Sequence, residues 1–330
     1  MRAMTTFGAA AHMVAIAAIA AMAATLPCAA AAYPDRPIRM VIHFPPGGPT
    51  DIVGRAVAQK LTAAWGQQVI VDNRPSAGGV VGVEAVVRSN PDGHTLLFAT
   101  GGSMSIAPAI NTNLPYNVFK DLAPISLVVI NPQILVFNPA FPPNSVAELV
   151  ALAKARPGKI NYASVGPGSP NHLGVEMLKS MAGIDLVHIP YKGTAPAITD
   201  VLGGQVSLMF NSMPSVLQHV RSGKLKGIAV GSAKRSPAAP EIPTVAESGV
   251  PGFDYVTWYG LFAPAATPKA IISRLNAEVV NMLKEPELAQ RLTTQGADPQ
   301  SSTPEGLARY MREEHERWKK IIKTAGIKLE

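Results

Sequence analysis

The sequence predicts an α/β fold with two lobes, each a mostly parallel sheet flanked by helices, and a ligand cleft between the lobes. Three observations predict it. Short apolar runs alternate with segments of helical period. The same alternation is repeated in the middle of the chain. Three helical segments without strands follow at the end, and these cannot make a third α/β sheet.

The first block of the chain alternates strictly between strand and helix. This β-α-β-α-β order implies a mostly parallel sheet with helices on both faces. Apolar runs predict strands at 38–44, 68–72 and 94–100, and helical periods predict helices at 52–65 and from the loop at 75–79 to about residue 88.

The middle block repeats the scheme and predicts a second α/β sheet. Strands are expected at 133–137, 159–164, 185–190, 205–210 and 225–230, and helices at 145–155, 172–181, 195–202 and 215–222.

The last block implies that the chain crosses between the lobes twice. Residues 236–253 are rich in Pro and Gly and predict a loop, and 255–264 predicts one more strand. Helices are expected at 268–283, 286–293 and 304–324, where they would cover the first sheet. The expected lobes are 33–131 plus 253–330 (lobe 1, discontinuous) and 132–252 (lobe 2). Two crossings make a hinge with a cleft beside it.

Residues 1–32 have the features of a secretory signal peptide. Arg2 precedes an apolar stretch over 9–26, and the alanines at 30–32 fit the small-residue cleavage pattern. We therefore expect cleavage before Tyr33 and export of the remaining 298 residues. A membrane-anchoring helix is the alternative, but the apolar run is short for a span of ~20 residues and is rich in Ala.

The composition argues against several classes of function. The formal net charge of +7 is spread along the chain without a dense Lys or Arg run, which disfavours nucleic acid and favours small anions. Cys28 is the only cysteine and precedes the expected cleavage site, so the mature chain has no disulfide and no thiol nucleophile. A lipoprotein anchor at Cys28 fits poorly with Pro27 before it. The histidines show no metal-ligand spacing, and we expect no metal and no cofactor.

The segment PPGGPTD at 45–51 joins a predicted strand to a predicted helix. Ligands bind at this edge of open α/β sheets, and glycines let the backbone approach them closely. Thr50 is a natural N-cap. Because the first N–H groups of a helix are unpaired and partly positive, the turn predicts an anion site made of backbone. Asp51 would repel an anion, so it either points away or meets an amino or hydroxyl group of the solute. The expected site residues are Pro46, Gly47, Gly48, Thr50 and Asp51.

A second turn of this kind, SVGPGSPNH, occupies 164–172 on the other predicted lobe. It again places glycines and a proline between a strand and a helix, and it adds hydroxyl and amide groups. Two such turns that face one cleft suggest a ligand with one or two carboxylates. Both turns could also be only tight turns. The expected site residues are Ser164, Gly166, Gly168, Ser169, Asn171 and His172.

Three further loops also lie at the carboxyl ends of predicted strands. TGGSMS at 100–105 offers hydroxyl donors, IPYKGTAP at 189–196 offers a phenol and an ammonium group, and FNSMPS at 210–215 offers an amide. From these loops we add Thr100, Gly101, Ser103, Tyr191, Lys192, Gly193 and Asn211.

The motifs of common catalytic and nucleotide sites do not match. The turn at 45–51 lacks the lysine of a P-loop, and GPGSPN lacks the third glycine of a dinucleotide fingerprint. There is no HExxH and no GxSxG. We expect a binding protein and not an enzyme, with an exported hydrolase that uses Ser103 or Ser169 as the alternative.

Several of these motifs together resemble the solute-binding receptors of tripartite tricarboxylate transporters, the Bug family. The resemblance covers essentially all of 33–330 and keeps the order of the motifs. Pro49 is a departure, because the family often has a small or charged residue there, and proline removes one N–H donor. The matching runs are FPPGGPTDIVGRAVAQKL, VDNRPSAGGVVGVEAV, NPDGHTLLFAT, NYASVGPGSPNHLGVEML, IPYKGTAPAITDVLGGQVSLMF and YGLFAPAATP.

The resemblance implies a type II periplasmic binding protein fold with a closing cleft. It implies a monomer in the periplasm that holds a carboxylated solute between the loops at 46–51 and 164–172. The solute classes left open are di- or tricarboxylates, amino acids and aromatic acids. The implied partners are the membrane subunits of a tripartite transporter, and a membrane sensor kinase is the alternative.

Overall fold

The computed structural model describes residues 33–76, 79–111 and 113–325. The contacts within the chain divide it into residues 1–35 and 36–330. The described part of the first unit, residues 33–35, forms no helix or strand. The predicted signal peptide, 1–32, lies outside the described residues. In the described part of the chain, no helix combines the length and the apolar character that a membrane span requires.

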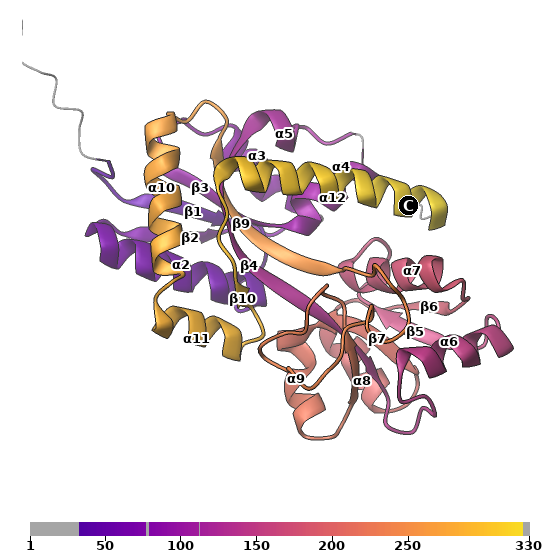
Figure 1. Ribbon diagram of the computed structural model, residues 1–330. Coiled ribbons are helices and arrows are strands. Elements are labelled where there is room, and N and C mark those ends of the chain that lie inside the picture. Colours follow the sequence, from indigo (N-terminus) through magenta and orange to yellow (C-terminus); the bar gives the residue numbers. More distant parts are fainter. Residues whose placement is uncertain (1–32, 77–78, 112, 326–330) are drawn as a thin grey trace, which may run out of the picture. The chain divides into compact units, whose positions relative to one another are not determined.

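One ten-stranded sheet runs through the second unit (Figure 1). Its main path has the strand order β2-β1-β3-β9-β4-β7-β5-β6, and β8 and β10 each pair with β4 beside this path. The strands are β1 (Ile38–Ile42), β2 (Val69–Asn73), β3 (Thr95–Thr100), β4 (Leu122–Phe137), β5 (Asn161–Ser164), β6 (Val187–Pro190), β7 (Leu208–Ser212), β8 (Lys226–Val230), β9 (Val256–Pro264) and β10 (Asp298–Pro299).

The predicted α/β class is confirmed, and the sheet is mixed where we expected it to be mostly parallel. β1 pairs in parallel with β2 and β3, and β5 pairs in parallel with β6 and β7. Between these two groups, β9 pairs antiparallel with β3 and β4, and β4 pairs antiparallel with β7. The parallel groups are joined by βα units, as predicted, whereas the middle of the sheet is made of long strands that return in the opposite direction.

β4 is much longer than the sequence predicted. We expected a strand over 133–137, and the structure extends it back to Leu122 despite Pro124 and Pro132. Its pairing with β9 contains two register shifts, one of them next to Pro124. A bulge lets a strand accommodate a residue that cannot donate to the ladder. The expected lobe boundary at 131/132 therefore falls inside one continuous strand.

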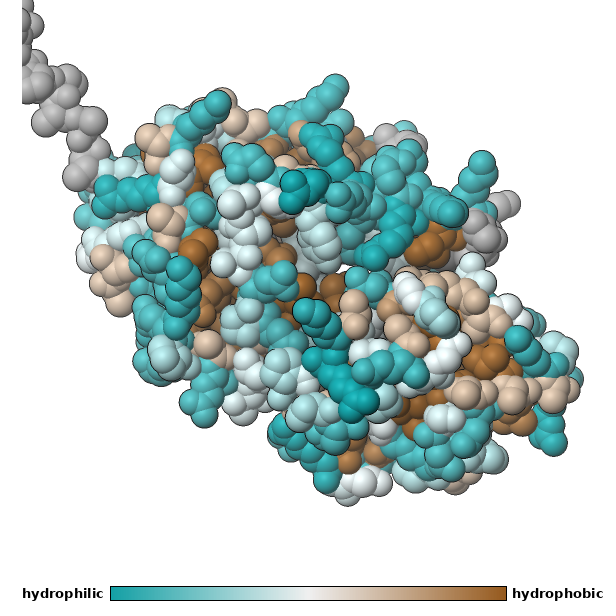
Figure 2. Space-filling model, in the orientation of Figure 1, coloured by the Kyte–Doolittle hydropathy of each residue, from teal (hydrophilic) through white to brown (hydrophobic). Residues whose placement is uncertain are grey.

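The longer helices lie close to their predicted positions, whereas the three short ones between residues 102 and 121 were not predicted. The helices are α2 (Pro49–Trp65), α3 (Val80–Val87), the π-helix η2 (Gly102–Ile106), α4 (Ala107–Ile110), α5 (Val118–Asp121), α6 (Val146–Ala155), α7 (Pro170–Ala182), α8 (Thr194–Leu202), α9 (Met213–Arg221), α10 (Lys269–Met282), α11 (Pro286–Thr294) and α12 (Pro304–Ala325). The long helix α12 carries hydrophilic side chains on its outer face in the view of Figure 2.

The helix α12 packs on both groups of strands, although we expected the final helices to cover the first sheet. Leu307 and Met311 join the apolar cluster around β3 and β9. Further along α12, Trp318 is fully buried in the cluster around α7 and β7, where its ring packs edge to face against Tyr255. Beneath the helix, the Glu314 carboxylate accepts a hydrogen bond from the indole of Trp258. The helix therefore ties the two parts of the core together.

His43, directly after β1, is held in an apolar niche and is 1% exposed. Gly79 and Gly82 give it room, because a Cβ at either position would lie within 3 Å of His43 atoms. Burial disfavours the charged imidazolium and lowers the pKa of His43 to about 4. The native protein therefore contains the neutral ring at physiological pH.

We predict that His43 makes the fold acid-sensitive. The pKa of His43 is lower in the folded state than in the unfolded state. As the pH falls below about 6.5, His43 therefore takes up a proton in the unfolded chain but not in the native protein, and the free energy of unfolding decreases. Between pH 7 and pH 5 this amounts to about 2 kcal/mol of unfolding free energy. Urea denaturation of His43→Gln should show a pH dependence weaker by that amount, and His219→Gln, on α9, should retain the wild-type dependence. Equal pH dependence in all three proteins would contradict the assignment.

Candidate functional site

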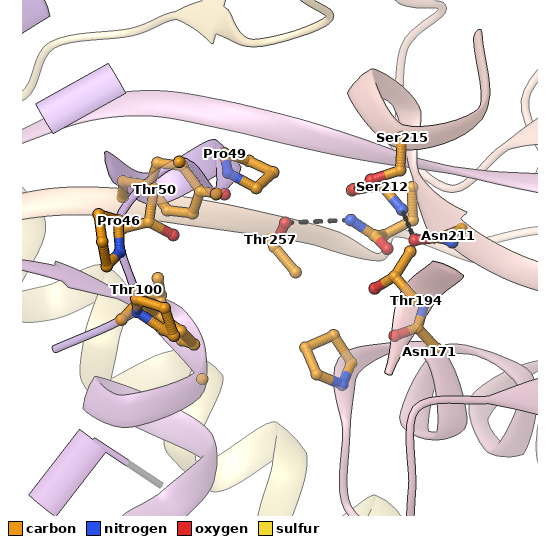
Figure 3. Close-up of a pocket in the computed structure, with 18 residues that line it drawn as sticks. Pro46, Pro49, Thr50, Thr100, Asn171, Thr194, Asn211, Ser212, Ser215 and Thr257 are labelled. Carbon is orange, nitrogen blue, oxygen red and sulfur yellow. Dashed lines mark hydrogen bonds between the residues drawn. The ribbon is translucent and has the colours of Figure 1, made fainter. Parts of the chain in front are cut away.

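The loop after β1 and the start of α7 border one cavity of about 590 Å³. This volume is typical of small-molecule sites. Strands β4 and β9 contribute Gln133, Thr257 and Tyr259 to its wall. In Figure 3, two groups of side chains face one another across the cavity, with Thr257 between them: Pro46, Pro49, Thr50 and Thr100 on one side, and Asn171, Thr194, Asn211, Ser212 and Ser215 on the other.

Four α-helices begin at the wall of this cavity. The first N–H groups of a helix have no intrahelical partner, and they lie at the positive end of the helix dipole. Several such ends around one space favour an anion there without any fixed cation. The contributing residues are Gly48, Pro49 and Thr50 from α2, Pro170 and Asn171 from α7, Thr194 from α8, and Ser212 and Ser215 from α9.

Asp51 acts as a clamp for the first loop and does not line the cavity. It is 3% exposed. Its Oδ2 accepts hydrogen bonds from the Gly47 amide (2.9 Å) and from Arg55 Nε (2.8 Å), and its Oδ1 accepts one from Asn73 (2.9 Å). Burial alone would raise the pKa of Asp51, but these hydrogen bonds outweigh it and the pKa is lowered. Of the two readings left open by the sequence, the carboxylate points away from the cleft.

The N-cap of α2 lies two positions before the expected one. We expected Thr50 to be the N-cap, and the structure gives that place to Gly48 in extended conformation, with Pro49 as the first helical residue. Proline fits this first position because its φ is already helical and its missing N–H is not needed. Thr50 is therefore free to hydrogen-bond Tyr259, whose pKa is raised by burial and partly lowered again by that bond.

The second loop satisfies much of its own backbone. The Gly168 amide donates to His172 Nδ1 (3.1 Å), and the Ser169 hydroxyl donates to the Gly166 carbonyl (2.6 Å). Ser169 is also the N-cap of α7, where its Oγ accepts from the His172 amide (3.4 Å). Because the Gly168 and His172 amides are occupied within the loop, this turn offers fewer backbone donors than the sequence suggested.

A group of aromatic rings supports the second loop from behind. His172 and His188 stack with ring centroids 4.2 Å apart, and Ser164 Oγ hydrogen-bonds His188 Nε2. Tyr162 donates to Glu176 (2.7 Å), and His172 also approaches Glu176. Burial lowers the pKa of His172 to about 4 and also lowers the pKa of His188. Both rings are neutral at physiological pH, which keeps His172 Nδ1 available as an acceptor.

The rest of the cavity is made of neutral polar groups held in fixed positions. Gln133 donates to Thr257 Oγ1 (3.1 Å), and the hydroxyls of Ser212 and Ser215 are 2.8 Å apart. Among the residues that the structure describes, no Lys, Arg, His, Asp or Glu lines the cavity. Among the described residues, no group of three or more His, Cys, Asp or Glu side chains could hold a metal ion. The cavity suits an anion that is recognised by N–H and O–H donors.

The structure brings part of the predicted site together. The cavity is lined by seven of the expected residues: Pro46, Gly47, Gly48, Thr50, Thr100, Asn171 and Asn211. It does not include eleven others: Asp51, Gly101, Ser103, Ser164, Gly166, Gly168, Ser169, His172, Tyr191, Lys192 and Gly193.

Several of these eleven residues support elements that do line the cavity. Gly101 packs against Trp258, because a Cβ there would lie 2.4 Å from the indole nitrogen. Tyr191 donates to Asp200, and Gly193 caps α8, whereas Lys192 is exposed.

Ser103 and Ser169, the two serines of the hydrolase alternative, both donate their hydroxyl groups to backbone carbonyls. Ser103 Oγ donates to the Thr100 carbonyl (3.0 Å). Ser169 Oγ donates to the Gly166 carbonyl, as described above. Neither hydroxyl hydrogen-bonds a histidine ring in the described part of the chain, so neither of these two serines is paired with a base that could activate it.

Sequence reasoning missed eleven lining residues. Thr257 and Tyr259 lie two apart on β9, so they share one face of the strand, and this alternation was the available signal. Most of the others are neighbours of predicted residues in the same loops. The missed residues are Phe44, Pro45, Pro49, Gly102, Gln133, Pro170, Thr194, Ser212, Ser215, Thr257 and Tyr259.

Comparison with known proteins gives a consistent result. Residues 53–327 match the model of the tripartite tricarboxylate transporter family receptor. Protein BugT of Bordetella pertussis is 39% identical over 312 residues, which cover 94% of this chain and 96% of that protein.

Solved structures with the same fold include proteins with bound acids. R. palustris Rpa4515 with adipate has 32% identity and a TM-score of 0.80, over 90% of this chain and 99% of that one. The periplasmic binding protein BugD has 38% identity and a TM-score of 0.76, over 90% and 99%. MatC from Rhodopseudomonas palustris with bound malate has 33% identity and a TM-score of 0.74, over 88% and 100%.

We predict that Asp51→Asn loosens the first loop. The substitution removes the charge from the acceptor of the Gly47 amide, and hydrogen bonds to charged groups contribute about 1.5–3 kcal/mol. Hydrogen exchange of the Gly47 amide, measured by NMR, should accelerate about tenfold or more.

Asp92→Asn is the matched control for this experiment. Asp92 accepts from the His94 amide and pairs with Arg36 away from the loop. Exchange at Gly47 that is unchanged by Asp51→Asn, or equally changed by both variants, would show that the clamp does not hold the loop.

Proposed function

Because the chain belongs to the family of tripartite tricarboxylate transporter receptors, we propose that it is exported to the periplasm, captures a small carboxylate in the described cavity and delivers it to the membrane subunits of such a transporter. The family consists of solute-binding receptors and not of enzymes. The export signal, the membrane partner and the solute are the parts of the proposal that rest on sequence features and on chemistry.

The observation that carries the proposal is the neutral, donor-rich cavity at which four helices begin. A carboxylate needs several N–H or O–H donors to replace its water shell. The helix starts at Gly48, Asn171 and Thr194 present backbone donors, and the hydroxyl pair of Ser212 and Ser215 at the start of α9 adds to them. Hydrogen bonds within the wall hold polar side chains such as Gln133 and Ser215 in place, so these side chains need little local rearrangement on binding.

The lining also favours acids without an ammonium group. A buried ammonium needs an anionic or strongly accepting partner, and no Asp or Glu of the described part of the chain lines the cavity. The nearest first-turn carboxylate, Asp51, is already paired with Arg55 and Asn73. The solved relatives are named with adipate and malate, which are dicarboxylates without an ammonium. We therefore place di- and tricarboxylates and aromatic acids ahead of amino acids.

The two-lobe division and the proposed ligand contacts belong to the same proposal. Residues 33–131 with 253–330 form one lobe and 132–252 the other, and β4 and β9 are the connections that flex when the cleft closes. The parallel groups of strands on either side of this pair support the division. Contacts to the solute come from the loops at 46–51 and 164–172, together with the cavity residues of the strands.

We predict that an organic acid stabilises the purified protein. A ligand at 100 times its Kd adds about 2.7 kcal/mol to the free energy of unfolding. Thermal-shift screening against di- and tricarboxylates, aromatic acids and amino acids should give hits among the first three groups. A screen in which no organic acid shifts the midpoint of a folded protein would refute the proposed function.

We predict that Gly48→Val weakens this binding with little loss of fold. Gly48 has a φ of −79°, and a Cβ there would meet nothing closer than the Pro45 carbonyl at 3.8 Å. The free protein therefore tolerates a side chain, at a cost of about 1 kcal/mol for a poorer N-cap. In the complex, the branched side chain would occupy cavity space, and calorimetry should show an affinity at least about tenfold weaker.

Gly203→Val is the matched control. Gly203 is the C-cap of α8 and has a φ of −77°. A Cβ at this position would lie 3.4 Å from the Thr199 carbonyl oxygen, and Gly203 does not line the cavity. Its affinity should equal that of the wild type. If Gly48→Val and Gly203→Val bind the acid equally well, the loop at 46–51 does not hold the solute.

A further inference from the structure

A second chamber of about 520 Å³ opens beside the main cavity. It lies where the first turn of α2, the first turns of α9 and the loop that follows α11 meet, and these three helices are neighbours in Figure 1. No predicted contact of the solute accounts for this space apart from Gly47, which borders both chambers.

The two chambers adjoin and share part of their lining. Gly47, Pro49 and Ser215 line both of them. These residues belong to the start of α2 and to the start of α9, which are two of the four helix starts at the main cavity. A molecule bound at the helix starts can therefore extend past Pro49 into the second chamber without leaving the protein surface.

The walls of the second chamber are apolar or neutral. Ile52, Val53 and Leu217 supply aliphatic surface. Ile52 is 40% exposed, whereas Val53 and Leu217 are each 3% exposed, so Ile52 supplies most of the accessible aliphatic surface of these three residues. The remaining polar contributors are amides and hydroxyls, and within 33–76, 79–111 and 113–325 no ionisable side chain lines the chamber.

We propose that the second chamber receives an apolar, uncharged portion of the solute while the carboxylate is held at the helix starts of the main cavity. This inference rests on the proposed function and narrows its substrate class to acids that carry an alkyl or aryl group of some length. Each carbon that leaves water against aliphatic surface contributes to affinity, whereas a second charge in this chamber would have no partner.

Asn131 lines this chamber and has a buried side-chain amide without hydrogen-bond partners among the described residues. It is 1% exposed, and neither atom of its amide has a hydrogen-bond partner within the described residues. Both atoms are sealed from solvent in this conformation, so we assign no ligand contact to them. The apolar wall around Ile52 is therefore what the inference depends on.

Pairs of acids with identical head groups test the inference. Succinate and benzylsuccinate form one pair, and butyrate and octanoate form the other. Titration calorimetry on the wild type should show that the member with the larger apolar group binds about tenfold tighter, with a more negative heat-capacity change on binding. In Ile52→Ser, the ratio between the affinities for the larger and the smaller acid should fall about fivefold. The affinity for the smaller acid should stay within about twofold of the wild-type value.

Ile70→Ser is the matched control, because Ile70 is 52% exposed on β2 and lines neither chamber. It should bind all four acids as the wild type does. The inference is wrong if Ile52→Ser weakens both members of a pair equally, if it changes neither, or if none of the four acids binds while another organic acid does. In each of those cases the proposed function stands. A protein that binds no organic acid at all refutes the proposed function itself.

Discussion

The antiparallel pairing of β4 with β9 is the constraint on which the rest of the structure depends. Nine residue pairs, from Leu122 with Pro264 to Pro132 with Val256, hold these strands together. Each strand then continues its pairing into a different parallel group, β9 with β3 and β4 with β7. The helix starts of the two groups face one cavity because these strands fix their separation, and the same strands furnish Gln133, Thr257 and Tyr259 to its wall.

The cavity attracts an anion through dipoles and hydroxyls instead of fixed charges. A lysine or arginine in the wall would bind carboxylates more strongly, but it would also need a partner when the site is empty, because unpaired buried charges are costly. Neutral donors avoid that cost and remain selective, since an acid that leaves one of them unpaired loses affinity. The one carboxylate in the first turn of α2, Asp51, is turned away and neutralised by Arg55.

The sequence was most informative where local rules decide the structure. Gly47 and Asn171 could be assigned to the cavity because parallel strands end at a common edge, and a strand followed by a glycine-rich turn and a helix start identifies that edge. Thr257 and Ser215 could not, because their place depends on how β9 crosses β4 and where α9 docks. The length of β4 was missed for a related reason: prolines at 124 and 132 argue locally against a strand, and only the bulged pairing with β9 overrides them.

The loops at 46–51 and 164–172 share a construction that was not evident from the sequence, because the two acceptors are of different chemical types. In each loop a glycine amide donates to a side chain four residues later, in the first turn of the following helix: Gly47 to Asp51, and Gly168 to His172. Each acceptor must stay deprotonated at the accepting atom. The pKa of Asp51 is lowered because hydrogen bonds from Arg55, the Gly47 amide and Asn73 outweigh burial, and that of His172 falls to about 4 because burial disfavours the imidazolium. One acceptor is thus kept charged and the other neutral, and both loops are held in the same way near neutral pH.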